Sequence, residues 1–268
     1  MPALARGCAI TQTPDRRRTF RIDSTQDEAE HPALSPGSGV YFFLGLSEMD
    51  TFEEARTKIF AEVTADDPRV RAEYLQRFGS EANEFSEVMA RVMQTWLKEH
   101  GDAQGNEKRV KVFALVFIAI HLHIGSMKLL LSGSTVAAGN LFRQTLETIA
   151  LALLCSGKDL GVLDRFNNDQ YSTNNAIRDV LQNVDKLGLE KDGVRALQNG
   201  QNFYHLYSHV TKLTIAVAES FAGEGIYVGT SFDEGKTEFY AKEVAGRLGL
   251  ARVLNSFVAT VKANVAKW

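Results

Sequence analysis

The chain has 268 residues, of which 44% are hydrophobic and 24% are charged, and its formal net charge at pH 7 is -3. This balance excludes a chain that is basic over its whole surface, and it leaves only a local basic patch for nucleic-acid binding. Two cysteines, Cys8 and Cys155, are too few for a disulfide framework. We therefore expect a reducing compartment and predict a cytoplasmic protein.

The distribution of proline predicts an all-α fold. Four of the five prolines lie within the first 36 residues, and none follows Pro68. Proline inside a helix removes a backbone donor and clashes with the preceding turn, at a cost of about 3 kcal/mol. A stretch this long without proline is typical of continuous helical packing, so we predict a multi-helix bundle.

Residues 1–38 differ from the rest of the chain. They mix charge, proline, glycine and serine without an apolar period, which predicts a disordered or loosely held leader without an export signal. The basic run Arg16–Arg18 is either a solvated part of this leader or a contact for RNA or an acidic lipid surface. We predict that residues 39–268 form a single helical domain.

Capping signals and apolar periods predict the elements that follow. Thr51 with Glu54 forms a capping box, and Asp67 can cap a helix that begins at Pro68. Between Phe85 and Leu97, apolar residues recur at steps of three and four, which indicates one buried helical stripe. The predicted elements are a short strand or buried lead-in over 40–46, helices over 51–63, 68–78 and 80–100, central helices within 112–127 and 135–156, an amphipathic stretch over 159–185, a shorter one over 189–199, a helix over 201–222, a loop or short hairpin over 222–231 and a last helix over 237–266.

The two central segments are the most apolar part of the chain. The stretch 112–127 carries no charge, but it is shorter than the roughly 20 residues that cross a bilayer. The next stretch carries Arg143 and Glu147 in its middle, which the hydrocarbon region disfavours. We therefore predict an antiparallel helical hairpin, turned at 132–134 and buried in the bundle, and no membrane association.

Several catalytic motifs are absent from the sequence. It contains no phosphate loop, no nucleophile elbow and no CxxC pair. His205 and His209 have a spacing that can chelate a metal on a helix, but Leu206 stands where a zinc protease would carry its glutamate. We expect no metal and no cofactor, and we expect His121 and His123 to be satisfied within or beside the core.

Polar residues gather on two of the predicted helices. Arg143 and Glu147 are one turn apart and can pair along the helix. Five hydrogen-bonding side chains follow within eight residues on the helix over 201–222, beside an apolar stripe. These five are Asn202, Tyr204, His205, Ser208 and His209, and the stripe is Leu206, Val210, Leu213 and Val217. Such a group either binds a phosphate or a base, or ties helices together.

An apolar helix with an Arg-x-x-x-Glu step, followed by a helix bearing Tyr-x-x-x-Ser-His, resembles bacterial helical proteins related to the HEPN superfamily, over roughly residues 110–220. The resemblance implies an all-α, commonly dimeric protein in a superfamily with many RNA-cleaving effectors of toxin systems and phage defence. Their site places an arginine and, further along the same helix, a histidine, with four to six residues between the two. In this chain Asn202, Phe203 and Tyr204 stand at those positions before His209, so Arg143 would supply the cation.

Two hypotheses follow. In the first, the protein binds or cleaves RNA without a metal: His209 acts as base or acid, Arg143 clamps the phosphate and Glu147 orients Arg143. The residues expected to hold the substrate are Tyr204, Ser208, His205 and Asn202. In the second, the protein is a non-catalytic helical dimer in which Arg143, Glu147 and His209 form a buried polar network that fixes helix register. A lipid-associated protein is a third alternative.

Overall fold

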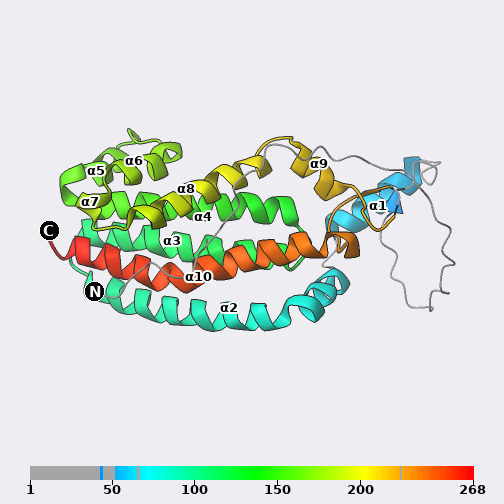
Figure 1. Ribbon diagram of the computed structural model, residues 1–268, viewed down its shortest axis with the longest axis horizontal. Helices are drawn as coiled ribbons and strands as arrows, with labels where there is room; N and C mark the ends of the chain where they lie inside the picture. The colour runs from blue at the N-terminus through cyan, green and yellow to red at the C-terminus, as the bar shows by residue number, and fades with distance from the viewer. Residues whose placement is uncertain (1–42, 45–51, 65–66, 224) are drawn as a thin grey trace.

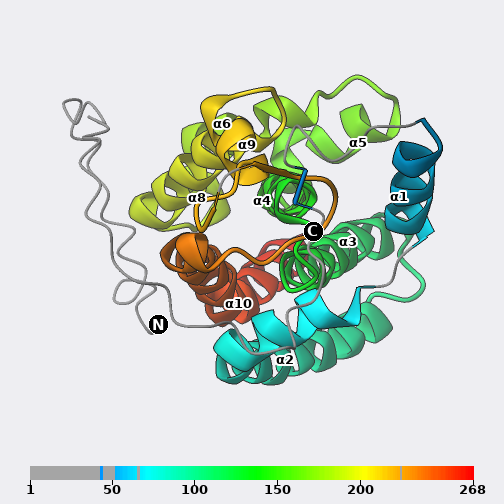
Figure 2. The same cartoon turned by 90° about the vertical axis from the view of Figure 1, so that its right-hand side faces the viewer.

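The computed structural model describes residues 43–44, 52–64, 67–223 and 225–268, and it confirms the all-α bundle. Four long helices run along the molecule (Figure 1). They are α2 (Pro68–Asp102), α3 (Glu107–Leu130), α4 (Thr135–Ser156) and α10 (Thr237–Val265). Helix α4 is the most enclosed of them, because α3, α10, α6 and α8 all pack against it (Figure 2).

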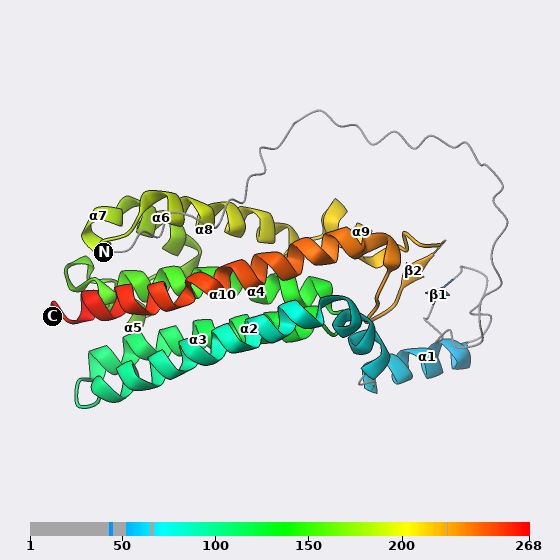
Figure 3. The same cartoon turned by 60° about the horizontal axis from the view of Figure 1, so that its bottom comes forward.

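Shorter elements cover one side and one end of the bundle. They are β1 (Phe43–Leu44), α1 (Phe52–Thr64), η1 (Lys158–Leu160), α5 (Val162–Asn167), η2 (Thr173–Asn175), α6 (Ala176–Gln182), α7 (Val184–Leu187), α8 (Lys191–Tyr204), η3 (His205–Tyr207), α9 (Lys212–Ala218), β2 (Ile226–Tyr227) and η4 (Glu234–Lys236). Helix α8 lies along α4, whereas α1, β1 and β2 lie together at the end of the bundle where α10 begins (Figure 3). The predicted leader and Thr51 lie outside the described residues, and the single domain over 39–268 stays a prediction.

The predicted central hairpin is present. Helices α3 and α4 are joined by a tight turn in which the backbone N–H of Gly133 and that of Ser134 donate to the carbonyls of Leu130 and Leu129. Gly133 has a φ of +81°, and a Cβ there would lie 2.7 Å from Val70 Cγ1 and 2.8 Å from the backbone of Ser231. Glycine is therefore required at this turn both by the backbone conformation and by the close approach of α2.

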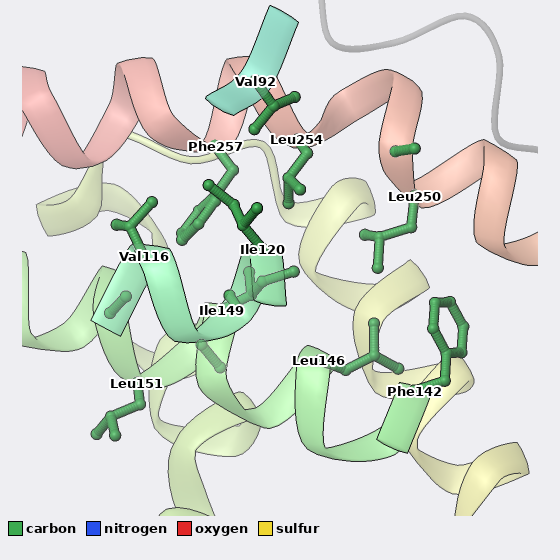
Figure 4. Close-up of a cluster of buried hydrophobic side chains, with 14 of the residues drawn as sticks. Val92, Val116, Ile120, Phe142, Leu146, Ile149, Leu151, Leu250, Leu254 and Phe257 are labelled. Carbon is green, nitrogen blue, oxygen red and sulfur yellow. The ribbon is translucent and has the colours of Figure 1, made fainter. Parts of the chain in front are cut away.

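The core lies between α2, α3, α4 and α10. Figure 4 shows Val92 of α2, Val116 and Ile120 of α3, and Leu254 and Phe257 of α10 converging on one apolar cluster. All five are buried. The stripe expected between Phe85 and Leu97 supplies buried Phe85, Met89 and Val92, so the helical period placed the α2 face correctly, but its last member, Leu97, is 57% exposed.

Two predicted boundaries differ from the structure because packing overrides local signals. Helix α2 runs through Gly79 without ending, and only Phe78, with φ -124° and ψ 22°, departs from helical geometry. Phe78 is buried, so packing holds this residue in the core, and the helix bends at Phe78 and continues. The predicted amphipathic stretch over 159–185 instead forms short pieces, the first of which is followed by Gly161 in the left-handed conformation.

The single helix predicted over 201–222 is wrong. Helix α8 ends at Tyr204, η3 makes one tight turn, and α9 begins only at Lys212. Thr211 is extended (φ -133°, ψ 169°) and forms a reciprocal capping box with Thr214. These side chains bind backbone groups that a continuous helix would use, so the helix is interrupted. The predicted stripe is lost with it, since Val210 is 91% exposed.

The strand over 40–46 is described only at Phe43–Leu44, which pairs antiparallel with Ile226–Tyr227 of β2. A bridge between Glu219 and Ile226 closes the loop predicted over 222–231. Buried Lys236 holds the end of α9, just before this loop, because its Nζ donates to the carbonyls of Val217, at 2.8 Å, and of Glu219. The segment that follows α9 is thus tied to the start of α10.

Two of the described helical segments are long and apolar enough to cross a membrane, judged by length and composition alone: α3 and Glu234–Val265. The stretch considered in the sequence was shorter than α3, which extends it at both ends. Both segments pack within the bundle, where 44% of the most apolar window of each is buried. The absence of membrane association stays a prediction.

The contact between α4 and η3 gives a first prediction. A Cβ at Gly139 would lie 2.5 Å from Cγ of the buried Tyr207 ring, so Gly139→Ala should destabilise the protein by about 1–3 kcal/mol in urea unfolding. Gly193→Ala in α8 is the matched control, because its added methyl meets open space; it should be neutral or stabilising by up to about 1 kcal/mol. Equal stability of the two variants would contradict the contact.

Candidate functional site

The ion pair predicted on α4 is formed. Arg143 Nε lies 2.9 Å from Glu147 Oε1, and the two side chains are 18% and 12% exposed. Arg143 Nη1 donates to Ser208 Oγ at 2.6 Å. The structure therefore brings together Arg143, Glu147 and Ser208, as expected, although Ser208 lies just beyond η3 and not on a helix.

Gln201 also contacts Glu147, which was not predicted from the sequence. Its Nε2 donates to Glu147 Oε1 at 3.0 Å from α8. Glu147 thus binds both Arg143 of its own helix and Gln201 of the neighbouring one. This second hydrogen bond fixes the carboxylate, and through it the orientation of the Arg143 guanidinium. Only the packing of α8 on α4 reveals it, because Gln201 has no sequence signal of its own.

His205 and His209 lie beside one another on the surface. Their ring centroids are 4.6 Å apart and the rings meet edge to face, and both residues are exposed. Ser208 connects His205 to Arg143, since its hydroxyl donates to the carbonyl of His205 at 2.8 Å and accepts from Arg143. We call Arg143, Glu147, His205, Ser208 and His209 the histidine cluster. Asn202 is also exposed, one turn earlier on α8.

Tyr204 does not join these exposed residues. It is 6% exposed, and its hydroxyl donates to Glu243 Oε2 at 3.2 Å. Tyr207 also points inward and donates to Glu243 Oε1 at 3.0 Å. Burial, reinforced by the Glu243 charge, raises the pKa of both phenols. Tyr204 therefore has a structural partner where a substrate contact was expected, because its ring lies on the inner side of α8, against Phe142 of α4.

Glu243 belongs to a buried ion pair that was not predicted from the sequence. Arg247 is fully buried, and its Nη1 lies 2.7 Å from Glu243 Oε2 while its Nε donates to Ser126 Oγ at 2.8 Å. Its guanidinium lies 4.9 Å from the centre of the Phe142 ring. Burial alone would lower the pKa of Arg247, but Glu243 and the tyrosines reverse this, and the net pKa is raised. The i, i+4 spacing on α10 was the available signal.

His123 is a core histidine, as expected, whereas His121 is exposed. The Nε2 of His123 lies 3.0 Å from the carbonyl of Arg247, so this nitrogen carries the donated proton. Burial, and next the charge of Arg247, lowers the pKa of His123 to about 3. The ring is therefore neutral at physiological pH.

The structure also bears on metal binding and on the cysteine thiol. No group of three or more His, Cys, Asp or Glu side chains in the described part of the chain could hold a metal ion. Burial raises the pKa of the Cys155 thiol to about 12, so this cysteine is not a thiolate nucleophile at neutral pH. The histidine cluster is thus the group of described residues that combines exposed imidazoles with an oriented cation.

The environment of His123 predicts a pH dependence of stability. The unfolded chain binds a proton at this residue near pH 6.5, about its ordinary pKa, whereas the folded chain binds it only near pH 3. Between these values the unfolded state holds more protons, so stability falls as the pH is lowered. Relative to His123→Gln, the wild-type free energy of unfolding should fall by about 1.4 kcal/mol per pH unit between about pH 6 and pH 4. Parallel pH profiles from urea unfolding of the two proteins would refute this assignment.

Comparison with known proteins adds no homologue. No family model matches the chain, and no curated protein or solved structure matches it significantly. A function must therefore be inferred from the side chains and their geometry.

Proposed function

We propose that the histidine cluster binds RNA phosphate, and that the protein is a helical RNA-binding protein that cleaves RNA without a metal. One observation carries the proposal: an arginine fixed by Glu147 and Ser208 lies beside two adjacent, exposed imidazoles. Among the described contacts, hydrogen bonds occupy Nε and Nη1 of Arg143 and leave Nη2 for a ligand oxygen. The resemblance to the HEPN superfamily is a second, weaker support.

The chemistry follows from the residue types. His209 accepts the proton of the ribose 2′-hydroxyl as its oxygen attacks the adjacent phosphorus. Arg143 stabilises the negative charge that develops on the phosphate oxygens. The bond from phosphorus to the 5′-oxygen then breaks, and His205 returns a proton to that oxygen. The products are a 2′,3′-cyclic phosphate and a 5′-hydroxyl, and neither step needs an oxidant or a metal.

The test is cleavage of mixed cellular RNA by the purified protein in the presence of a chelator. Wild type should cleave, and His209→Ala should lose about a hundredfold or more of the rate, because the proton acceptor is gone. His121→Ala is the matched control, an exposed histidine on α3 outside the cluster, and it should keep the wild-type rate. Cleavage that survives in His209→Ala would remove the central residue of the proposal.

A second function has an observation of its own. Arg143, Glu147, Gln201 and Ser208 satisfy one another across α4 and α8, as a structural tie in a non-catalytic interaction protein would. His209 is exposed and so lies outside any such buried network, contrary to the expectation from sequence. In this second function the tie, together with apolar contacts such as that of Tyr204 with Phe142, holds α8 on α4.

The double variant Arg143→Met with Glu147→Leu separates the two functions. If the cluster binds phosphate, this variant should stay folded with the wild-type oligomeric state and lose RNA binding in fluorescence anisotropy. If the pair is a structural tie, the variant should lose stability or change its oligomeric state in analytical ultracentrifugation. The same sedimentation run tests the homodimer, which, like a cytoplasmic location, is part of our proposal.

A further inference from the structure

We propose that Glu243, a buried residue on α10, is a positioning residue for the histidine cluster. It holds Tyr204 and Tyr207, between which His205 lies, and so fixes the turn that presents His205 and His209 to solvent. The expected effect on RNA affinity rests on the proposed function. The positioning itself is measured separately, through the contact between His205 and His209.

Each carboxylate oxygen of Glu243 accepts one phenol. Tyr204 donates to Oε2 at 3.2 Å and Tyr207 donates to Oε1 at 3.0 Å. The two tyrosines are three residues apart, and their rings stack at 5.6 Å with an angle of 19°. Holding both ends of this short segment to one rigid group leaves η3 a single geometry, because a change of its turn would break one of the two hydrogen bonds.

Glu243 is itself immobile. Its side chain is 3% exposed and pairs with Arg247, whose side chain is fully buried and which also binds Ser126 on α3. Phe142 packs edge to face against the Tyr204 ring at 4.6 Å. In a close-packed core such groups cannot shift without opening a void. The carboxylate is thus a fixed point of the bundle rather than a flexible surface acid.

The same segment is held from α4, the helix that carries Arg143. Asn140 Nδ2 donates to the backbone carbonyl of Tyr207 at 3.1 Å, and Gly139 lets the Tyr207 ring lie directly against the α4 backbone. Helices α4 and α10 therefore both hold Tyr207, the residue immediately before Ser208. This places the exposed histidines at a defined position relative to Arg143, which a free loop would not do.

The experiment uses the full chain labelled with ¹³C and ¹⁵N at histidine, and it compares wild type with Tyr207→Phe and Glu243→Gln. In the wild type, the imidazole protons of His205 and His209 should show a mutual nuclear Overhauser effect, since their centroids are 4.6 Å apart. Tyr207→Phe removes one donor, and Glu243→Gln replaces one of the two accepting oxygens by an amide nitrogen. Either change should weaken or abolish that effect and lower RNA affinity about tenfold or more, because misplacement of such groups is costly.

Tyr171→Phe is the matched control. Tyr171 also donates its hydroxyl to a carboxylate, that of Asp179, but Tyr171 lies in the segment between α5 and η2 and Asp179 lies on α6, outside the cluster. It should leave both the histidine contact and RNA affinity unchanged.

A histidine contact that survives in folded Tyr207→Phe and Glu243→Gln would overturn the proposal and leave Glu243 a purely structural residue. Loss of the contact in either variant, but not in Tyr171→Phe, supports it. If that contact is lost while the wild type itself binds no RNA, positioning stands and the proposed function fails. If one of Tyr207→Phe and Glu243→Gln fails to fold, the histidine contact measured in the other variant is sufficient for the test.

Discussion

The buried pair of Glu243 and Arg247 is the interaction on which the arrangement of the bundle around the site depends. A charge placed in the core must be paired and hydrogen-bonded, and removing one partner typically costs about 3–5 kcal/mol. Here the pair has partners on four other elements: Ser126 on α3, the Phe142 ring on α4, Tyr204 at the end of α8 and Tyr207 on η3. The need to satisfy one buried carboxylate therefore determines how α8 ends.

That ending determines the surface above it. Because both phenols turn inward to Glu243, the residues between and after them face solvent, and the two histidines come to lie side by side. The capping box of Thr211 and Thr214 then stops the helix from resuming before Lys212. Arg143 and Glu147 form the facing side from α4, where Gln201 fixes them. A buried polar network and an exposed polar cluster thus share one segment of chain.

Much of the fold could be predicted from local sequence rules. Asp67 caps α2 through the backbone N–H groups of Arg69 and Val70, and Gly133 turns the central hairpin, because these are short-range signals with definite geometry. The pairing of Arg143 with Glu147 is equally local. The interruption after Tyr204 could not be predicted in this way, since no proline lies there and the capping threonine competes with a helix that the apolar period favours.

The long-range contacts needed the structure. Glu243 and Arg247 have the spacing of an ordinary surface pair, and only the packing of α10 against α3 and α4 places them in the core. Gln201 and the pairing of β1 with β2 depend on segments distant in sequence in the same way. The candidate site was therefore half predicted: its charged pair and histidines were identified, but Tyr204 was misplaced and the buried support was not seen.

The central claim is that RNA phosphate binds at His205 and His209, and a titration of histidine-labelled protein with a short RNA tests it directly. With a chelator present, the imidazole resonances of His205 and His209 should shift together with added RNA, while those of the exposed His121 and the buried His123 should stay in place. If the resonances of these four histidines do not respond, or if all four move to the same extent, RNA does not bind at His205 and His209.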